Sequence, residues 1–149
     1  LYPHATSASL NISTPLWSKA DSQLFVSAGY GTGSRLLNLE QRGASTIAIQ
    51  RWANHRVRFH FSNAVRVGPF IVGSSGDFGP MFLTAVRAET GEIAWQDRTF
   101  ARAQLLVADG KLLILDEDGR VGLAQVTETG LKVLASAPLL EPMAWTPPT

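Results

Sequence analysis

The fold class is decided by the stretch Ala85-Val86-Arg87-Ala88-Glu89-Thr90-Gly91-Glu92-Ile93-Ala94-Trp95, because the chain repeats it. It aligns without gaps with Ala124-Gln125-Val126-Thr127-Glu128-Thr129-Gly130-Leu131-Lys132-Val133-Leu134. Both copies predict a strand, a Thr-Gly turn and a second strand, since glycine accepts the backbone angles of tight turns. A unit that recurs in this way indicates a repeat architecture.

An apolar strand is also predicted upstream of each copy. These strands contain Phe70-Ile71-Val72 and Leu112-Leu113-Ile114, and an earlier equivalent contains Leu24-Phe25-Val26. The copies are spaced by about 40 to 46 residues, which is the length of a four-stranded propeller blade.

Short apolar runs separated by Gly, Asp, Asn and Pro extend over the whole chain, and no helical period of 3.6 is sustained. The predicted strands are 23–28, 35–39, 46–52, 56–61, 64–67, 70–74, 81–87, 93–98, 104–108, 111–116, 121–127 and 132–138. The sequence therefore predicts an all-β fold of about three β-propeller blades, each of four antiparallel strands. The expected blades are approximately 13–61, 62–103 and 104–149, as an open arc or as part of a larger ring.

The pattern Ala85-x-x-x-x-Thr90-Gly91-x-x-x-Trp95 resembles the tryptophan-docking repeat of quinoprotein-like propellers, which usually reads Ala-x-Asp-x-x-Thr-Gly-x-x-x-Trp. The resemblance implies that Trp95 is a wedge between neighbouring blades and that Thr90 and Gly91 form its turn. Trp52, at the end of the first copy, takes the same structural role.

The repeats are degenerate in comparison with that family. Arg87 stands where the family has Asp, and the gapless alignment puts Leu134 where the last copy would have Trp. The resemblance includes cofactor-free members of the outer-membrane assembly lipoprotein type, which implies a periplasmic or secreted location.

Composition leaves the choice of partner open but excludes some classes. The 149 residues are 45% hydrophobic, so a substantial core is expected, and a net charge of +1 gives no bulk attraction to nucleic acid or an anionic membrane. No run approaches the ~20 apolar residues of a membrane-spanning helix. The start, Leu1-Tyr2-Pro3-His4, has no initiator Met and no signal-peptide pattern, so the chain is expected to be part of a longer product.

The segment 55–61 is the main candidate for a binding site. Its strict alternation predicts a strand with one packed face of Val57, Phe59 and Phe61. The other face is basic and consists of Arg56, Arg58 and His60. These cations would bind an anionic ligand or acidic peptide if the strand lined a central channel, whereas they would be merely solvated on an outer strand.

Other motifs predict ordinary turns rather than chemistry. The glycine cluster 29–35 and the acidic cluster 116–119 are expected to form hairpin turns, and the three histidines His4, His55 and His60 are not grouped as a zinc site. The chain has no cysteine, no Gly-x-Ser-x-Gly motif and no recognisable ligand set for a cofactor, so neither a metal nor a cofactor is predicted.

Two functions are consistent with these observations. The first is a non-enzymatic propeller module that acts as a scaffold for a protein or peptide partner. The alternative is a fragment of a pyrroloquinoline-quinone-dependent dehydrogenase, whose family holds its quinone with calcium. Three blades do not close a ring alone, so the missing blades are expected from a longer chain or from a second copy in a homo-oligomer.

Overall fold

The computed structural model describes residues 2–7, 9–141, 143–145 and 148, and every regular element in this part of the chain is a β-strand. The all-β prediction is therefore confirmed. Within the described residues there is no helix of the length and hydropathy needed to span a membrane.

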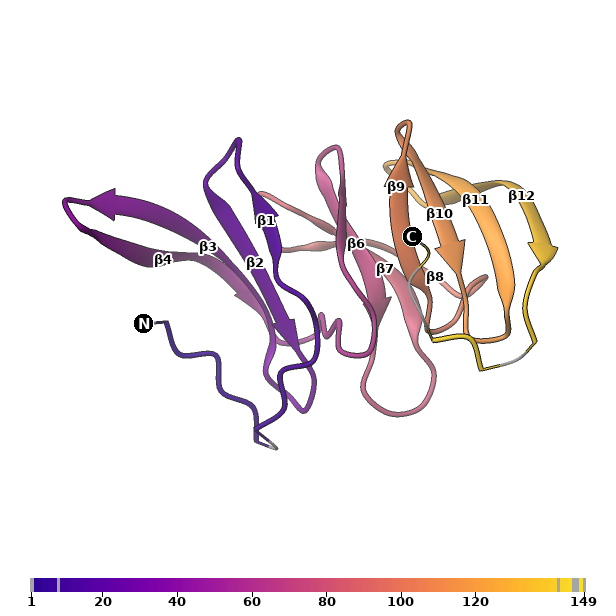
Figure 1. Cartoon of the computed structure of the whole chain (residues 1–149), viewed down its shortest axis with the longest axis horizontal. Coiled ribbons are helices and arrows are strands. Elements are labelled where there is room, and N and C mark those ends of the chain that lie inside the picture. Colours follow the sequence, from indigo (N-terminus) through magenta and orange to yellow (C-terminus); the bar gives the residue numbers. More distant parts are fainter. Residues whose placement is uncertain (1, 8, 142, 146–147, 149) are drawn as a thin grey trace.

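Twelve strands form three sheets, and strands that are neighbours in the sequence pair antiparallel within each sheet (Figure 1). The first sheet contains β1 (Leu16–Ser18), β2 (Gln23–Ala28), β3 (Gly33–Arg42) and β4 (Ser45–Asn54). The second contains β5 (Val65–Val67), β6 (Phe70–Ser75), β7 (Phe82–Arg87) and β8 (Ile93–Asp97). The third contains β9 (Gln104–Ala108), β10 (Lys111–Leu115), β11 (Arg120–Val126) and β12 (Leu131–Pro138). The prediction of three units of four antiparallel strands is confirmed.

The two clusters expected to be turns form the β2–β3 and β10–β11 turns. Gly31 and Gly33 adopt positive φ angles of 80° and 77°, which favour glycine. In the second turn the Asp116 carboxylate accepts a hydrogen bond from the Arg120 amide at 2.9 Å, as Asp commonly does in turns.

One row of side chains crosses each sheet and, in the first two sheets, faces the sheet that follows. In the first sheet the paired residues of this row are Leu16, Phe25, Leu36 and Trp52. In the second sheet they are Val65, Val72, Ala85 and Trp95. In the third sheet they are Leu106, Leu113, Leu123 and Ala135.

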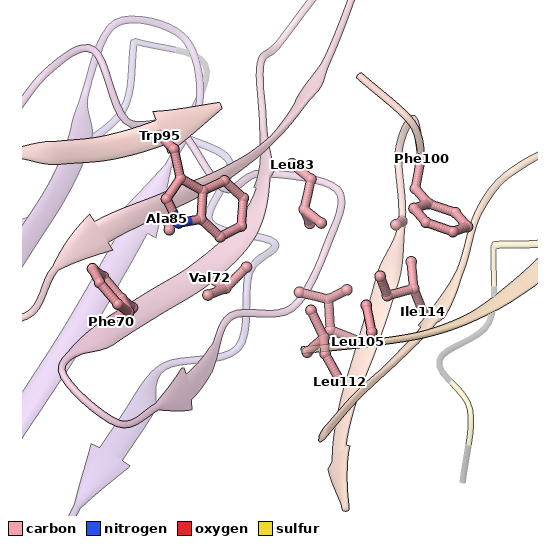
Figure 2. Packing of buried hydrophobic residues seen from close by; sticks show 11 residues of the cluster. Phe70, Val72, Leu83, Ala85, Trp95, Phe100, Leu105, Leu112 and Ile114 are labelled. Atoms are coloured by element: carbon pink, nitrogen blue, oxygen red, sulfur yellow. The ribbon is translucent and has the colours of Figure 1, made fainter. Parts of the chain in front are cut away.

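In the described part of the chain, the first two rows belong to two hydrophobic cores. The first row packs against Ile71 and Val86 of the second sheet and against Ala88 of the β7–β8 turn. The second row packs against Leu105, Leu112 and Ile114 of the third sheet (Figure 2). Each large aliphatic or aromatic side chain buried in this way contributes about 1.5–3 kcal/mol to stability, so these interfaces hold the sheets together.

A β-bulge lies at the same place in all three sheets, between the third and fourth strands. The pairs next to it are Leu36–Trp52, Ala85–Trp95 and Leu123–Ala135. Ala135 therefore holds the position of the tryptophans in the third sheet. The gapless alignment was wrong by one residue at this position, because the hairpin between Ala124 and Val133 is two residues longer than the one between Val86 and Ile93, and Leu134 corresponds to Ala94, the extra residue of the bulge.

The predicted strand 56–61 does not form, and β1, which was not predicted, is the missing strand of the first sheet. Residues 55–64 instead connect β4 to β5, with one isolated bridge between Phe59 and Ser75. The alternation is real only in part: Val57 and Phe59 are buried, but next along the chain His60 is buried and Phe61 is exposed. A connector that passes between two packed sheets also buries some of its apolar side chains, so its sequence can resemble that of a strand.

The connectors pack through a phenylalanine against a glycine of the sheet they enter. A Cβ atom on Gly73 of β6 would lie 2.9 Å from the Phe59 ring, and one on Gly122 of β11 would overlap the Phe100 ring. Neither position has space for a real side chain, so these glycines leave room for the two rings.

Candidate functional site

Both tryptophans named from the repeat reach across to the next sheet. The Trp52 indole Nε1 donates to the Ala88 carbonyl at 2.9 Å, and Trp95 Nε1 donates to the Thr127 carbonyl at 2.9 Å. A Cβ atom on Gly91 would lie 2.5 Å from the Trp52 ring. Thr90, in the same turn, is exposed and its hydroxyl donates to Glu92 Oε2 at 3.2 Å. These contacts join sheets and belong to the architecture.

The three predicted cations of segment 55–61 do not form one basic face. Arg56 is exposed, and its amide is bonded to the Asn54 side chain. Arg58 and His60 instead lie in one cluster with Asp77 of the β6–β7 loop, because the β4–β5 connector is hydrogen-bonded to the start of that loop. The chemistry of this cluster is mixed rather than basic.

Asp77 joins three segments of the chain. Its Oδ2 accepts from Arg58 Nη1 at 3.0 Å and from the Tyr30 amide of the β2–β3 turn at 3.0 Å. The Asp77 side chain is only 7% exposed, whereas that of Arg58 is 38% exposed. A buried carboxylate requires such partners, so this ion pair holds the loop, the connector and the turn together.

His60 is fully buried at the centre of the cluster. The Gly29 amide donates to its Nδ1 at 3.3 Å, and the Tyr30 ring meets it edge-on with the ring centres 4.8 Å apart. Burial lowers the pKa of His60 below its ordinary value, although the Asp77 carboxylate acts in the opposite direction. The neutral ring, which accepts at Nδ1, carries its proton on Nε2.

Three buried polar atoms in this cluster have no hydrogen-bond partner among the described residues: Arg58 Nε, His60 Nε2 and Asp77 Oδ1. Unpaired buried polar groups are costly, so each one needs an explanation, and a functional role is one such explanation. The cluster is therefore a candidate site on geometric grounds.

The same end of the sheets collects the chain segments before β1, β5 and β9 and the turns β2–β3, β6–β7 and β10–β11 (Figure 1, lower side). We call it the connector end. Several large hydrophobic side chains are exposed there: Ile12, Phe61, Phe78, Leu139, Leu140, Met143 and Trp145.

Two adjacent cavities open among these side chains. One of about 210 Å³ is lined by Phe61, Arg102, Gln104 and Trp145. The other, of about 200 Å³, is lined by hydroxyl and amide groups of Ser13, Thr14, Ser62 and Asn63 and by Ile12, His60, Phe61 and Gln104. Phe61 and Gln104 line both cavities, so the two lie side by side, one mainly apolar and the other with polar side chains.

Most residues of this site carry no recognisable signal in the sequence. Asp77 lies in the stretch Gly76-Asp77-Phe78-Gly79, which has no recognisable catalytic context. Asn63 and Gln104 bond the β4–β5 connector to β9, through Asn63 Nδ2 to the Leu105 carbonyl at 2.7 Å and Gln104 Nε2 to the Phe61 carbonyl at 2.8 Å. Only the fold brings these residues together.

Comparison with known proteins gives no match. No family model, curated protein or solved structure is similar to the chain at a significant level. Among the described residues no three His, Cys, Asp or Glu side chains are grouped to hold a metal ion, so no ligand set for the calcium of a quinone cofactor is found there. The function has to be argued from the surfaces themselves.

Proposed function

We propose that this chain is a three-blade portion of a β-propeller and acts as a scaffold that binds a protein partner through an exposed peptide segment. The binding face is the connector end. The observation that carries the proposal is the pair of adjoining cavities there, flanked by exposed aromatic side chains.

The propeller arrangement is supported by the row of side chains that recurs in each sheet. Two of the three rows are covered by the following sheet, and the third is open. In the open row Leu106 is 37% exposed, and a shallow hollow of about 210 Å³ is lined by Leu113, Leu123, Ala135 and their neighbours on β11 and β12. We infer that a further four-stranded sheet with an aliphatic row covers this face, as the second and third sheets do for the first two rows.

The connector end has the composition of a peptide-binding surface. Phe61 is 46% exposed and Trp145 is 62% exposed, and Arg102 and Gln104 lie beside them in the same cavity. Rigid aromatic side chains next to an arginine are the residues that contribute most of the binding energy at protein interfaces. An aromatic or large aliphatic side chain of the partner would enter this cavity, and the neighbouring polar cavity would accommodate its backbone.

Selection of random linear peptides displayed on phage, with the chain immobilised, tests this proposal. We expect enrichment of peptides that contain aromatic or large aliphatic residues. The double variant Phe61→Ser/Trp145→Ser is expected to bind a selected peptide at least about tenfold more weakly, since each lost anchor removes roughly 1 kcal/mol or more.

Ile49→Ser is the matched control, because Ile49 is also an exposed apolar residue but lies on β4, away from the connector end. This variant is expected to bind the peptide as the unmodified chain does. Selection of no peptide, or equal binding by the Phe61→Ser/Trp145→Ser variant, would show that the connector end is not the binding face.

A further inference from the structure

We propose that His60 is a pH-sensitive latch of the connector end: its neutral ring holds the β2–β3 turn in place, and protonation displaces this turn and pairs the ring with Asp77 of the β6–β7 loop instead. The proposal concerns regulation of the surface described above and rests on the proposed function only for its biological meaning. The latch itself is a property of the buried cluster.

The hydrogen bond to Gly29 requires the neutral ring. A backbone amide can only donate, so Nδ1 of His60 must be the unprotonated acceptor of the 3.3 Å bond. A second proton on the ring would occupy Nδ1 and would point at the Gly29 N–H. Protonation of His60 and this hydrogen bond are therefore mutually exclusive.

The ring has no room to turn away while the β2–β3 turn keeps its position. His60 is 0% exposed, and a Cβ atom on Gly29 would lie 2.8 Å from its Cγ atom. The Tyr30 ring contacts it from the next residue of the same turn. Loss of the Gly29 hydrogen bond thus has to displace the backbone of the turn.

The charged groups around His60 offer the protonated ring a different hydrogen-bond partner. Arg58 of the connector and Asp77 of the β6–β7 loop lie beside it, and the Tyr30 phenol belongs to the same cluster. Asp77 uses Oδ2 for both of its hydrogen bonds, while Oδ1 has no partner among the described residues. A charged His60 that loses Gly29 gains this carboxylate oxygen as an acceptor, so the protonated state is also satisfied.

The displacement would reach the exposed surface through aromatic contacts. Tyr30 packs against Phe78 with ring centres 5.6 Å apart, and His60 packs against Phe61 with ring centres 4.3 Å apart. Phe78 is 78% exposed and Phe61 borders both cavities. A change at His60 therefore alters the shape of the proposed peptide site.

An NMR titration of the full chain without any ligand tests the latch. We expect the Cε1–H signal of His60 to titrate below pH 6.5, the ordinary midpoint of a histidine. The amide signals of Gly29, Tyr30 and Asp77 should shift with the same midpoint. The Gly91 amide, in the β7–β8 turn away from this cluster, should not follow it.

Variants assign the transition to His60. In His60→Gln, whose amide oxygen can still accept from Gly29, the Gly29 transition should disappear, whereas His4→Gln and His55→Gln should keep it. If His60→Gln does not fold, Asp77→Asn decides, because loss of the carboxylate should move the His60 midpoint to lower pH. The latch is refuted if Gly29 stays unchanged while His60 titrates, or if His60 does not titrate before the chain unfolds.

The latch and the peptide site can fail separately. If the amide signals shift as expected but the chain selects no peptide, the latch is supported and the proposed function is refuted. If the amide signals shift but a selected peptide binds with the same affinity above and below the His60 midpoint, the latch does not regulate the site.

Discussion

At Gly91 the turn between β7 and β8 meets the indole ring of Trp52 from the neighbouring sheet. Gly91 has a φ of 76°, and its Cα leaves no room for a methyl group against the ring. This one residue therefore satisfies two requirements, a left-handed backbone and close approach of two sheets, and a side chain there would disturb both.

Gly91→Ala is expected to lower the free energy of unfolding by about 2–4 kcal/mol, through backbone strain and displacement of Trp52. Gly110→Ala is the control, since Gly110 has a φ of 66° but open space around it. That variant should lose only about 1–2 kcal/mol, the cost of the left-handed backbone. Urea denaturation followed by tryptophan fluorescence measures both, and equal losses would mean that the Trp52 contact contributes nothing.

His4 and His60 predict how stability depends on pH. Burial lowers the pKa of both residues in the folded chain, and the Arg35 guanidinium lowers that of His4 further. The unfolded chain therefore binds more protons below pH 6.5 than the folded chain does. The free energy of unfolding is therefore not reduced by these residues well above this pH, and it decreases as the pH falls below it.

Urea denaturation at about pH 7.5 and 5.5 should accordingly show lower stability at the acidic pH, and the difference should shrink in His4→Gln/His60→Gln. His55→Gln, at an exposed position, should leave the difference unchanged. An undiminished difference in the double variant would assign the acid sensitivity to other groups.

At the level of strands and connectors, Asn63 fixes the β4–β5 connector to the third sheet. Its side chain donates to the Leu105 carbonyl at 2.7 Å and accepts from the Leu105 amide at 2.9 Å, as a neighbouring strand would. One side chain thus continues the hydrogen bonding of β9 beyond its own sheet.

Asn63→Ala should cost about 2–3 kcal/mol in unfolding free energy, because two backbone groups of Leu105 lose their partner. The exposed Asn11 offers the control Asn11→Ala, which is expected to change stability by less than about 0.5 kcal/mol. Urea denaturation compares the two variants. A small loss at Asn63 would indicate that water replaces both bonds.

The sequence predicted most strands because apolar runs and turn residues are local signals. It could not show that residues 56–61 are a connector, since Val57 and Phe59 are buried there just as they would be in a strand. The β11–β12 hairpin is two residues longer than the β7–β8 hairpin, and a gapless alignment cannot show such a difference, so it did not find Ala135 at the position of the tryptophans. The cluster of His60 with Asp77 could not be predicted either, because it depends on how the β6–β7 loop packs against the β4–β5 connector.

At the scale of the whole molecule, the open row of the third sheet is an apolar face that no other sheet in the described part of the chain covers. Exposed faces of this kind cause association in solution. The isolated chain is therefore expected to form species larger than its 16.1 kDa monomer, increasingly so as the protein concentration rises.

Leu113→Lys/Leu123→Lys should restore a 16.1 kDa monomer in light scattering, because two charges on this face oppose its burial. Ile47→Lys/Ile49→Lys on β4 is the matched control and should associate as the unmodified chain does. A discrete dimer of the unmodified chain would identify a second copy as the covering sheet. An unmodified chain that stays monomeric at every concentration would speak against the third sheet as a docking face.

The bulge shared by the three sheets has a consequence for insertions and deletions. Side chains alternate between the two faces of a strand, so the unpaired Arg51, Ala94 and Leu134 each reset which face the rest of the strand presents. Removal of one of these residues would turn Trp52, Trp95 or Ala135 to the wrong face of its sheet. Length changes between related chains should therefore collect in the hairpin loops and connectors and spare the outer strands.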